Sequence, residues 1–196
     1  SNAGGLGTIG PHAGQDSLPD SRYVALDRMR QEIKKVRKLT HRPFAATLFN
    51  GPDLKFWRPT AEMFVEQGVE AVLVNEVLDP DIFDFLKANG FKILYRALTP
   101  TIYNSREAER LGADVVIATG FDEGGSVPSR VIGTFSIVPM IVDSVQIPVI
   151  AAGGISDVRS VRAALALGAE GVFAGSLFLT ADENPADEKV KRLIVD

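Results

Sequence analysis

Two pairs of small residues in the last third of the chain have the arrangement of a phosphate-binding site. Gly153-Gly154 follows the apolar run Pro148–Ala152, and Gly175-Ser176 follows the apolar run Gly171–Ala174. Small residues let an anion approach backbone amides, and the N-terminus of a following helix favours negative charge. If the two runs are neighbouring parallel strands, both pairs lie at one rim and can bind the same phosphate group.

A repeated strand–helix unit must position these residues. A phrase made of a glycine, an acidic residue and an apolar run occurs three times, in Gln67–Val74, Leu111–Ala118 and Leu167–Ala174. In each copy the glycine is expected to end a helix, and the continuous apolar run is typical of a strand buried on both faces. Strands of this kind that alternate with helices predict a parallel sheet covered by helices.

The pattern predicts seven strands separated by helices. The strands are expected near Leu6–Ile9, Phe44–Phe49, Ala71–Val74, Lys92–Tyr95, Val115–Ala118, Pro148–Ala151 and Gly171–Ala174. The helices are expected near Ser21–Leu39, Pro59–Gln67, Pro80–Ala88, Ser105–Leu111, Thr134–Val145 and Asp157–Leu167, with a last helix beginning near Pro185.

Seven strands are one fewer than a closed (β/α)8 barrel contains. The chain opens on Gly4-Gly5-Leu6-Gly7, which has the composition of a helix-to-strand turn. We therefore predict a TIM (β/α)8 barrel whose first strand–helix unit lies outside this sequence, with residues 1–196 forming one domain. An open doubly wound sheet is the alternative. The two glycine motifs disfavour it, because they fall on consecutive late strands, where barrels frequently bind phosphate.

The composition limits the classes of function. The chain has 196 residues, a net charge of −4, 45% hydrophobic residues and no cysteine, so disulfides, thiolate metal sites and cysteine nucleophiles are excluded. No basic block predicts nucleic-acid binding, and no apolar run reaches the roughly 18 residues of a membrane span. We expect a cytoplasmic protein that acts on a small molecule.

In the content and order of its motifs, the sequence resembles the nitronate monooxygenase family, formerly the 2-nitropropane dioxygenases, which includes the FMN-dependent enoyl-ACP reductases of the FabK type. The matching stretches are Ser1–Gly10, Thr40–Phe44, Gly112–Val116, Glu123–Gly125, Pro148–Ile155 with Asp157, and Leu167–Val172 with Gly175-Ser176. The resemblance implies an FMN-dependent oxidoreductase. It also implies NAD(P)H as a reductant and a nitronate, a quinone or an enoyl thioester as the substrate.

The resemblance implies which residues hold the cofactor. Gly153, Gly154, Gly175 and Ser176 stand at the positions that bind the FMN phosphate. Arg96 stands where many members carry a lysine that contacts the cofactor, and a cation there stabilises a phosphate or the negative charge of reduced flavin.

Five further positions are expected near the flavin ring. Thr47 replaces an asparagine that usually faces the ring, and it retains one hydrogen-bond donor. Asn75 ends the next strand, and Thr119 and Gly120 end the strand Val115–Ala118. Gly125 belongs to the glycine pair that follows Glu123.

Ser126 is the main departure from the family pattern. Many members read Gly-Gly-His where this chain reads Gly124-Gly125-Ser126, and the family's histidine acts as a base or orients the substrate. A serine hydroxyl does not titrate near neutrality, so it is a poor general base. Ser126 is therefore named as the catalytic position only because it stands where the family has its histidine. Flavin redox chemistry, in which the cofactor carries the hydride and the electrons, needs no such base from the protein.

Three acidic residues complete the set of candidates. Asp122 and Glu123 follow the strand Val115–Ala118, and no third ligand completes a metal site, so we expect them to be solvated. Asp157 is expected to cap the helix that follows the first glycine pair.

Other functions are compatible with the same pattern. A phosphate-binding isomerase, aldolase or synthase needs a strong base or a Schiff-base lysine at the end of a strand, whereas Lys92 begins its strand. A non-catalytic flavin-binding remnant is favoured by Ser126 and by the missing first strand. That missing strand would also leave an open sheet edge, which a second copy of the chain could cover in a homo-oligomer.

Overall fold

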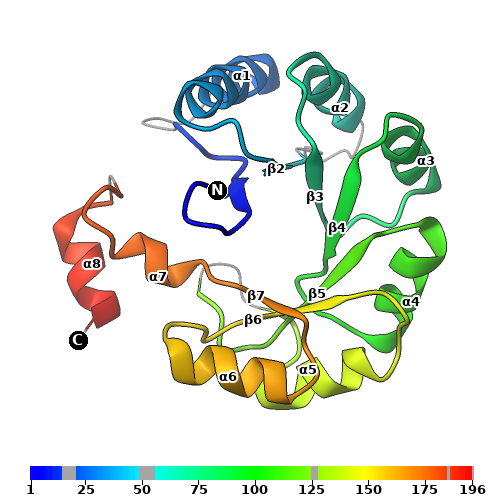
Figure 1. The fold of residues 1–196 in the computed structure, drawn as a ribbon, viewed down its shortest axis with the longest axis vertical. Helices are drawn as coiled ribbons and strands as arrows, with labels where there is room; N and C mark the ends of the chain where they lie inside the picture. The colour runs from blue at the N-terminus through cyan, green and yellow to red at the C-terminus, as the bar shows by residue number, and fades with distance from the viewer. Residues whose placement is uncertain (15–20, 49–55, 125–127, 185, 196) are drawn as a thin grey trace. The chain divides into compact units, whose positions relative to one another are not determined.

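The computed structural model describes residues 1–14, 21–48, 56–124, 128–184 and 186–195. Its seven strands form one sheet in the order β1-β2-β3-β4-β5-β6-β7, and helices alternate with the strands along the chain (Figure 1). The strands are β1 (Gly7–Ile9), β2 (Phe44–Thr47), β3 (Ala71–Asn75), β4 (Lys92–Arg96), β5 (Val115–Thr119), β6 (Val149–Ala152) and β7 (Gly171–Phe173).

Every helix except the four-residue one at Ser176–Leu179 falls close to a predicted position. The helices are α1 (Arg22–Leu39), α2 (Trp57–Glu66), α3 (Pro80–Ala88), α4 (Ile102–Leu111), α5 (Thr134–Val142), α6 (Val158–Ala166), α7 (Ser176–Leu179) and α8 (Glu188–Val195). Three bounds differ by three residues, since α4 begins at Ile102, α5 ends at Val142 and α8 begins at Glu188. Among the described residues, no helix combines the length and the apolar character needed to cross a membrane.

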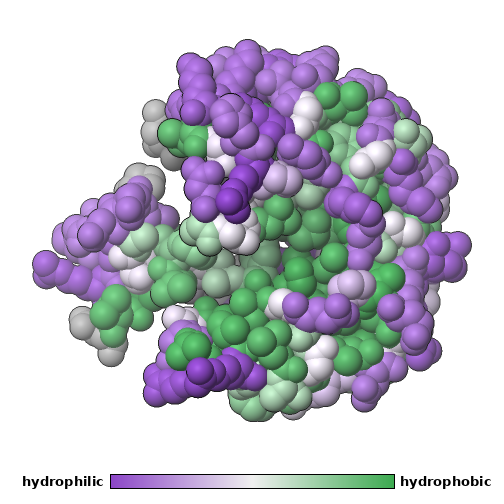
Figure 2. Space-filling view, in the orientation of Figure 1, coloured by the Kyte–Doolittle hydropathy of each residue, from purple (hydrophilic) through white to green (hydrophobic). Residues whose placement is uncertain are grey.

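The chain divides into two compact units, and the first contains Ser1–Leu94 with Leu111–Ala113. In this unit β1, β2 and β3 pair in parallel, with Gly7 opposite Phe44 and Ala45 opposite Ala71. Their side chains and those of α1, α2 and α3 form a core in which Phe64 and Phe83 are fully buried. Hydrophilic residues cover the outer sides of these helices (Figure 2). Burial of such a continuous apolar layer is the main force that holds helices on a sheet.

The second unit contains Tyr95–Arg110 with Asp114–Asp196. Its strands β5, β6 and β7 pair in parallel, with Thr119 opposite Ala152 and Ala152 opposite Phe173. Helix α5 buries Ile137, Val138 and Ile141 in the core of this unit. Because parallel strands in register end at one rim, the residues that follow β5, β6 and β7 are brought together there.

The repeated glycine phrase has the predicted role of ending helices. Gly68, Gly112 and Gly168 have φ angles of 63°, 99° and 95°, in the left-handed region that favours glycine. At Gly168 an added Cβ would also lie 2.9 Å from Cγ1 of Val142. Each glycine therefore turns the chain from a helix into the next strand.

Candidate functional site

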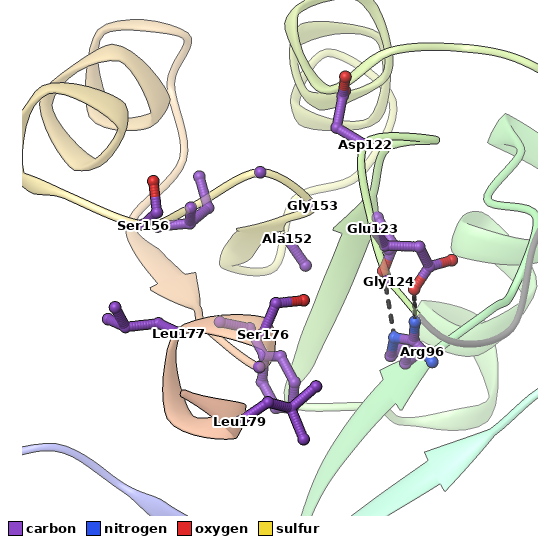
Figure 3. A pocket seen from close by; sticks show the side chains of 15 residues that line it. Arg96, Asp122, Glu123, Gly124, Ala152, Gly153, Ser156, Ser176, Leu177 and Leu179 are labelled. Atoms are coloured by element: carbon purple, nitrogen blue, oxygen red, sulfur yellow. Dashed lines mark hydrogen bonds and ion pairs between the residues drawn. The ribbon is translucent and has the colours of Figure 1, made fainter. Parts of the chain in front are cut away.

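A cavity of about 450 Å³ lies in the second unit, at the carboxyl ends of its strands (Figure 3). Gly153 and Gly154 after β6 line it, as do Gly175 and Ser176 after β7. Arg96, at the end of β4, and Thr119, at the end of β5, also line it, so six predicted residues share this cavity. The prediction that both pairs of small residues, Gly153-Gly154 and Gly175-Ser176, reach one rim is thus confirmed. Phosphate binding there stays a prediction.

The turn after β6 needs glycine for its own backbone. Gly153 and Gly154 have φ angles of 96° and 68°, which side-chain-bearing residues rarely adopt. A Cβ on Gly153 would lie 2.8 Å from the carbonyl oxygen of Gly120 and 2.9 Å from Oγ1 of Thr134. The backbone angles and the close packing therefore both favour glycine at this turn.

Gly175 is different, because nothing in its own conformation requires glycine. Its φ is −117°, and no atom of the described residues lies within 4 Å of an added Cβ. A side chain there would project into open space at the cavity wall. A glycine at this position places no side chain over the neighbouring backbone, which is a feature of anion sites.

Arg96 and Glu123 form an ion pair in the cavity wall (Figure 3). The side chains are 21% and 8% exposed, and Arg96 Nε also donates to Thr119 Oγ1 at 3.2 Å. The expectation that Glu123 is solvated is therefore wrong. The end of β4 lies beside the loop after β5 in the cavity wall, and this proximity of segments distant in the chain cannot be inferred from the acidic pair alone.

Asp122 is exposed to solvent in a loop, as expected, but it also has hydrogen-bond partners on α5. It lies on the side of α5, and its Oδ2 accepts hydrogen bonds from the backbone N of Thr134 at 2.7 Å and from Thr134 Oγ1 at 3.0 Å. These bonds, led by the one from the backbone N–H, hold the pKa of Asp122 below its usual value. Thr134 was missed in the sequence, where the only signal was its place at a predicted helix start.

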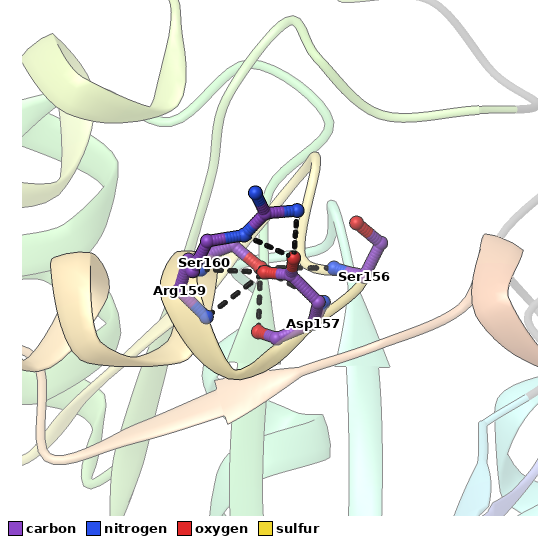
Figure 4. Close-up of polar contacts among 4 residues, drawn as sticks. All are labelled: Ser156, Asp157, Arg159 and Ser160. Carbon is purple, nitrogen blue, oxygen red and sulfur yellow. Dashed lines mark hydrogen bonds and ion pairs between the residues drawn. The ribbon is translucent and has the colours of Figure 1, made fainter.

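Asp157 has the predicted capping role (Figure 4). Its Oδ1 accepts from the backbone N of Arg159 at 2.9 Å and of Ser160 at 3.0 Å, and Ser160 Oγ accepts from the backbone N of Asp157 at 3.1 Å. This reciprocal capping box satisfies amides at the start of α6. The hydrogen bond from the Ser160 backbone, with the side chain of Arg159, lowers the pKa of Asp157 to about 2.

Asp157→Ala is expected to lower the melting temperature by a few degrees at neutral pH. A carboxyl group with a depressed pKa in the folded state stabilises the fold above its unfolded pKa of about 3.8, and this contribution is lost as the pH falls toward 2. The difference between wild type and variant should therefore be constant above about pH 5 and shrink between pH 4 and 2, measured by circular dichroism melting. Asp157→Asn is the control, because asparagine caps well and does not titrate. A difference independent of pH would contradict this assignment.

The remaining predicted residues divide between the two units. Thr119 lines the cavity, and Gly120 packs so tightly on Thr134 that an added Cβ would overlap it. Thr47 and Asn75 end β2 and β3 in the first unit. Asn75 Oδ1 is buried and has no hydrogen-bond partner among the described residues. Gly125 and Ser126 lie outside the described residues.

The described part of the chain offers no metal centre. Within residues 1–14, 21–48, 56–124, 128–184 and 186–195, no group of three or more histidine, aspartate or glutamate side chains is arranged to hold a metal ion. The acidic residues near the cavity instead bind Arg96 and Thr134. The polar groups that the described residues offer at the site are therefore backbone amides, hydroxyls, the Asp122 carboxylate and one arginine–glutamate pair.

Known proteins resemble this chain over its whole length. The family model for nitronate monooxygenase matches residues 1–56 and 57–196. A probable nitronate monooxygenase of Staphylococcus saprophyticus is 33% identical over 99% of this chain and 63% of the relative. The corresponding protein of Staphylococcus haemolyticus is 31% identical over 100% of this chain and 63% of the relative.

Two solved structures also resemble this chain. FabK from Thermotoga maritima has a TM-score of 0.82 at 33% identity, over 98% of this chain and 57% of that one. A nitroalkane oxidase from Streptomyces ansochromogenes has a TM-score of 0.83 at 28% identity, over 100% of this chain and 64% of that one. The chain thus spans about 63% of its curated relatives, and the likeness confirms the predicted (β/α) barrel class of fold. The chain belongs to the nitronate monooxygenase family.

Proposed function

We propose that the protein is an FMN-dependent oxidoreductase whose cavity in the second unit binds the FMN phosphate. The observation that carries this proposal is Gly175, which lines the cavity although neither its φ angle nor its packing among the described residues calls for glycine. Membership of the nitronate monooxygenase family supports FMN as the source of the phosphate.

The residues of the cavity fit a phosphate and its attached chain. The amides that follow β6 and β7 belong to residues without bulky side chains, and the Ser176 hydroxyl adds one donor. Apolar side chains of Ile155, Phe173, Leu177 and Leu179 complete the wall. FMN, when bound, supplies the hydride and electron transfer.

Arg96 provides the positive charge of the proposed site. The ion pair with Glu123 and the hydrogen bond to Thr119 hold the guanidinium in place, and the group stays protonated. A guanidinium held in a partly buried wall interacts more strongly with an anion than one in free solvent. We therefore assign Arg96 to orienting the anionic end of the cofactor or the substrate.

The substrate class follows from the family and is part of the same proposal. A nitronate, a quinone or an enoyl thioester would accept or donate electrons, with NAD(P)H as the reductant. No histidine or lysine lines the cavity among the described residues. The residues described at the cavity thus bind and orient, and they supply no strong base.

The visible absorbance of the purified protein tests the proposed function. We expect flavin bands, or their appearance when FMN is added, and release of FMN on denaturation. A colourless protein that does not take up added FMN would contradict the proposal. Oxidation of NAD(P)H in the presence and absence of a nitronate then distinguishes a reductase from a protein that only binds flavin.

A further inference from the structure

Three segments of the second unit meet behind the Gly153–Gly154 turn. The backbone N of Gly120, after β5, donates to the carbonyl oxygen of Ala152 at 2.9 Å. Thr134, the first residue of α5, donates its hydroxyl to the carbonyl oxygen of Gly153 at 2.9 Å and contacts that of Ala152 at 3.4 Å. Asp122 accepts from both the backbone N and the hydroxyl of Thr134.

The connection from Asp122 to the turn depends on the hydroxyl of Thr134. This hydroxyl carries one hydrogen, so it donates to one of its acceptors at a time, while the Thr134 backbone N–H bonds Asp122 independently. Thr134 is 7% exposed, so water cannot readily replace it as a donor to the Gly153 carbonyl. Hydrogen bonds in such an environment are stronger than in solvent.

The segments also pack without room for adjustment. A Cβ on Gly120 would overlap Thr134, and a Cβ on Gly154 would lie 3.2 Å from Cβ of Asp122. A shift of Asp122 or Thr134 would therefore move the turn itself, because no flexible side chain lies between them. Asp122 belongs to the residues that line the cavity, and in Figure 3 its carboxyl group points away from the cavity's centre.

We propose that Asp122 and Thr134 are positioning residues that hold the Gly153–Gly154 turn in the conformation that binds an anion. The identity of that anion as the FMN phosphate rests on the proposed function above. A turn whose backbone amides are already fixed in place loses less conformational entropy when it binds an anion. The competing explanation is that Asp122 only caps α5, whose N-cap residue, Gly133, has no side chain to do so.

Thr134→Val separates these two roles. Valine keeps the shape of threonine and the backbone N–H that donates to Asp122, but it removes the hydroxyl that bonds Gly153. Thr134→Ser restores that hydroxyl. Ser144→Ala is the matched control, because the Ser144 hydroxyl is buried and donates to the carbonyl of Ile141 at 2.8 Å, beyond the other end of α5.

Two measurements are made on the purified protein. Amide hydrogen exchange of the segment 151–156, without ligand, reports the rigidity of the turn. Fluorescence titration with FMN reports the dissociation constant. Thr134→Val should raise both the exchange rate and the FMN dissociation constant about 10-fold, the expected effect of one lost hydrogen bond. Thr134→Ser and Ser144→Ala should stay within about 3-fold of wild type in both.

The positioning role is overturned if Thr134→Val exchanges like wild type, or if Thr134→Ser changes the turn as much as Thr134→Val does. An equal effect of Ser144→Ala would also overturn it, because the turn would then respond to any loss in the helix. If Thr134→Val does not fold, Asp122→Ala, which removes the acceptor, is compared in the same way, and unchanged exchange again refutes the role. Failure of the wild type to bind FMN refutes the proposed function, while the exchange comparison still decides the positioning role.

Discussion

Gly175→Val is expected to weaken FMN binding by about 100-fold or more, while the melting temperature stays close to that of the wild type. Valine would fill open space at the cavity wall and cover the amides of Gly175 and Ser176. Loss of two charge-assisted hydrogen bonds to a phosphate accounts for an effect of this size. The fold should tolerate the change, because φ of Gly175 is −117° and no described atom lies within 4 Å of the added Cβ.

Fluorescence titration with FMN and a thermal melt measure the two parts of this prediction. Gly5→Val is the matched control, because Gly5 also has no atom of the described residues within 4 Å of an added Cβ and precedes β1 in the first unit. An unchanged FMN dissociation constant in Gly175→Val would remove these amides from the site. A large fall in melting temperature would instead show that Gly175 serves packing.

Arg96→Met should lower the free energy of unfolding by about 3 kcal/mol, because it leaves the Glu123 carboxylate in a largely buried position without its guanidinium. The Glu123 side chain is 8% exposed, so solvent can compensate only part of the lost interaction. The same variant should weaken FMN binding, since Arg96 lines the cavity.

Urea unfolding followed by circular dichroism measures the stability of this variant. Arg110→Met is the control, because Arg110 forms an ion pair with Glu107 on α4 while its side chain is 65% exposed. Exposed pairs of this kind contribute little to stability. If Arg96→Met is as stable as Arg110→Met, the Arg96–Glu123 pair has no special role in the cavity wall.

The strand–helix repeat was predictable because its signals are local. Each glycine of the repeated phrase ends a helix with a positive φ, and each apolar run after it forms a strand. The two pairs of small residues after β6 and β7 could be placed at one rim, because neighbouring parallel strands in register end together. The short helix α7 was not predicted, because four residues after a strand are too few to show a helical period.

The polar contacts of the site could not be read from the sequence. Asp122 and Glu123 are adjacent in the chain, yet one binds Thr134 and the other binds Arg96. Both partners come from other segments, and a single sequence holds no signal that pairs them. The four small residues of the predicted phosphate site also proved unequal, since Gly153 and Gly154 have backbone angles that favour glycine and Gly175 does not.

Comparison of FMN with riboflavin is the most direct test of the central claim, because the two ligands differ only in the phosphate. Each is titrated into the flavin-free protein, and the dissociation constants are measured by fluorescence. Amides after β6 and β7, together with Arg96, predict that FMN binds about 100-fold or more tightly than riboflavin. Equal dissociation constants for the two ligands would contradict a phosphate site in this cavity.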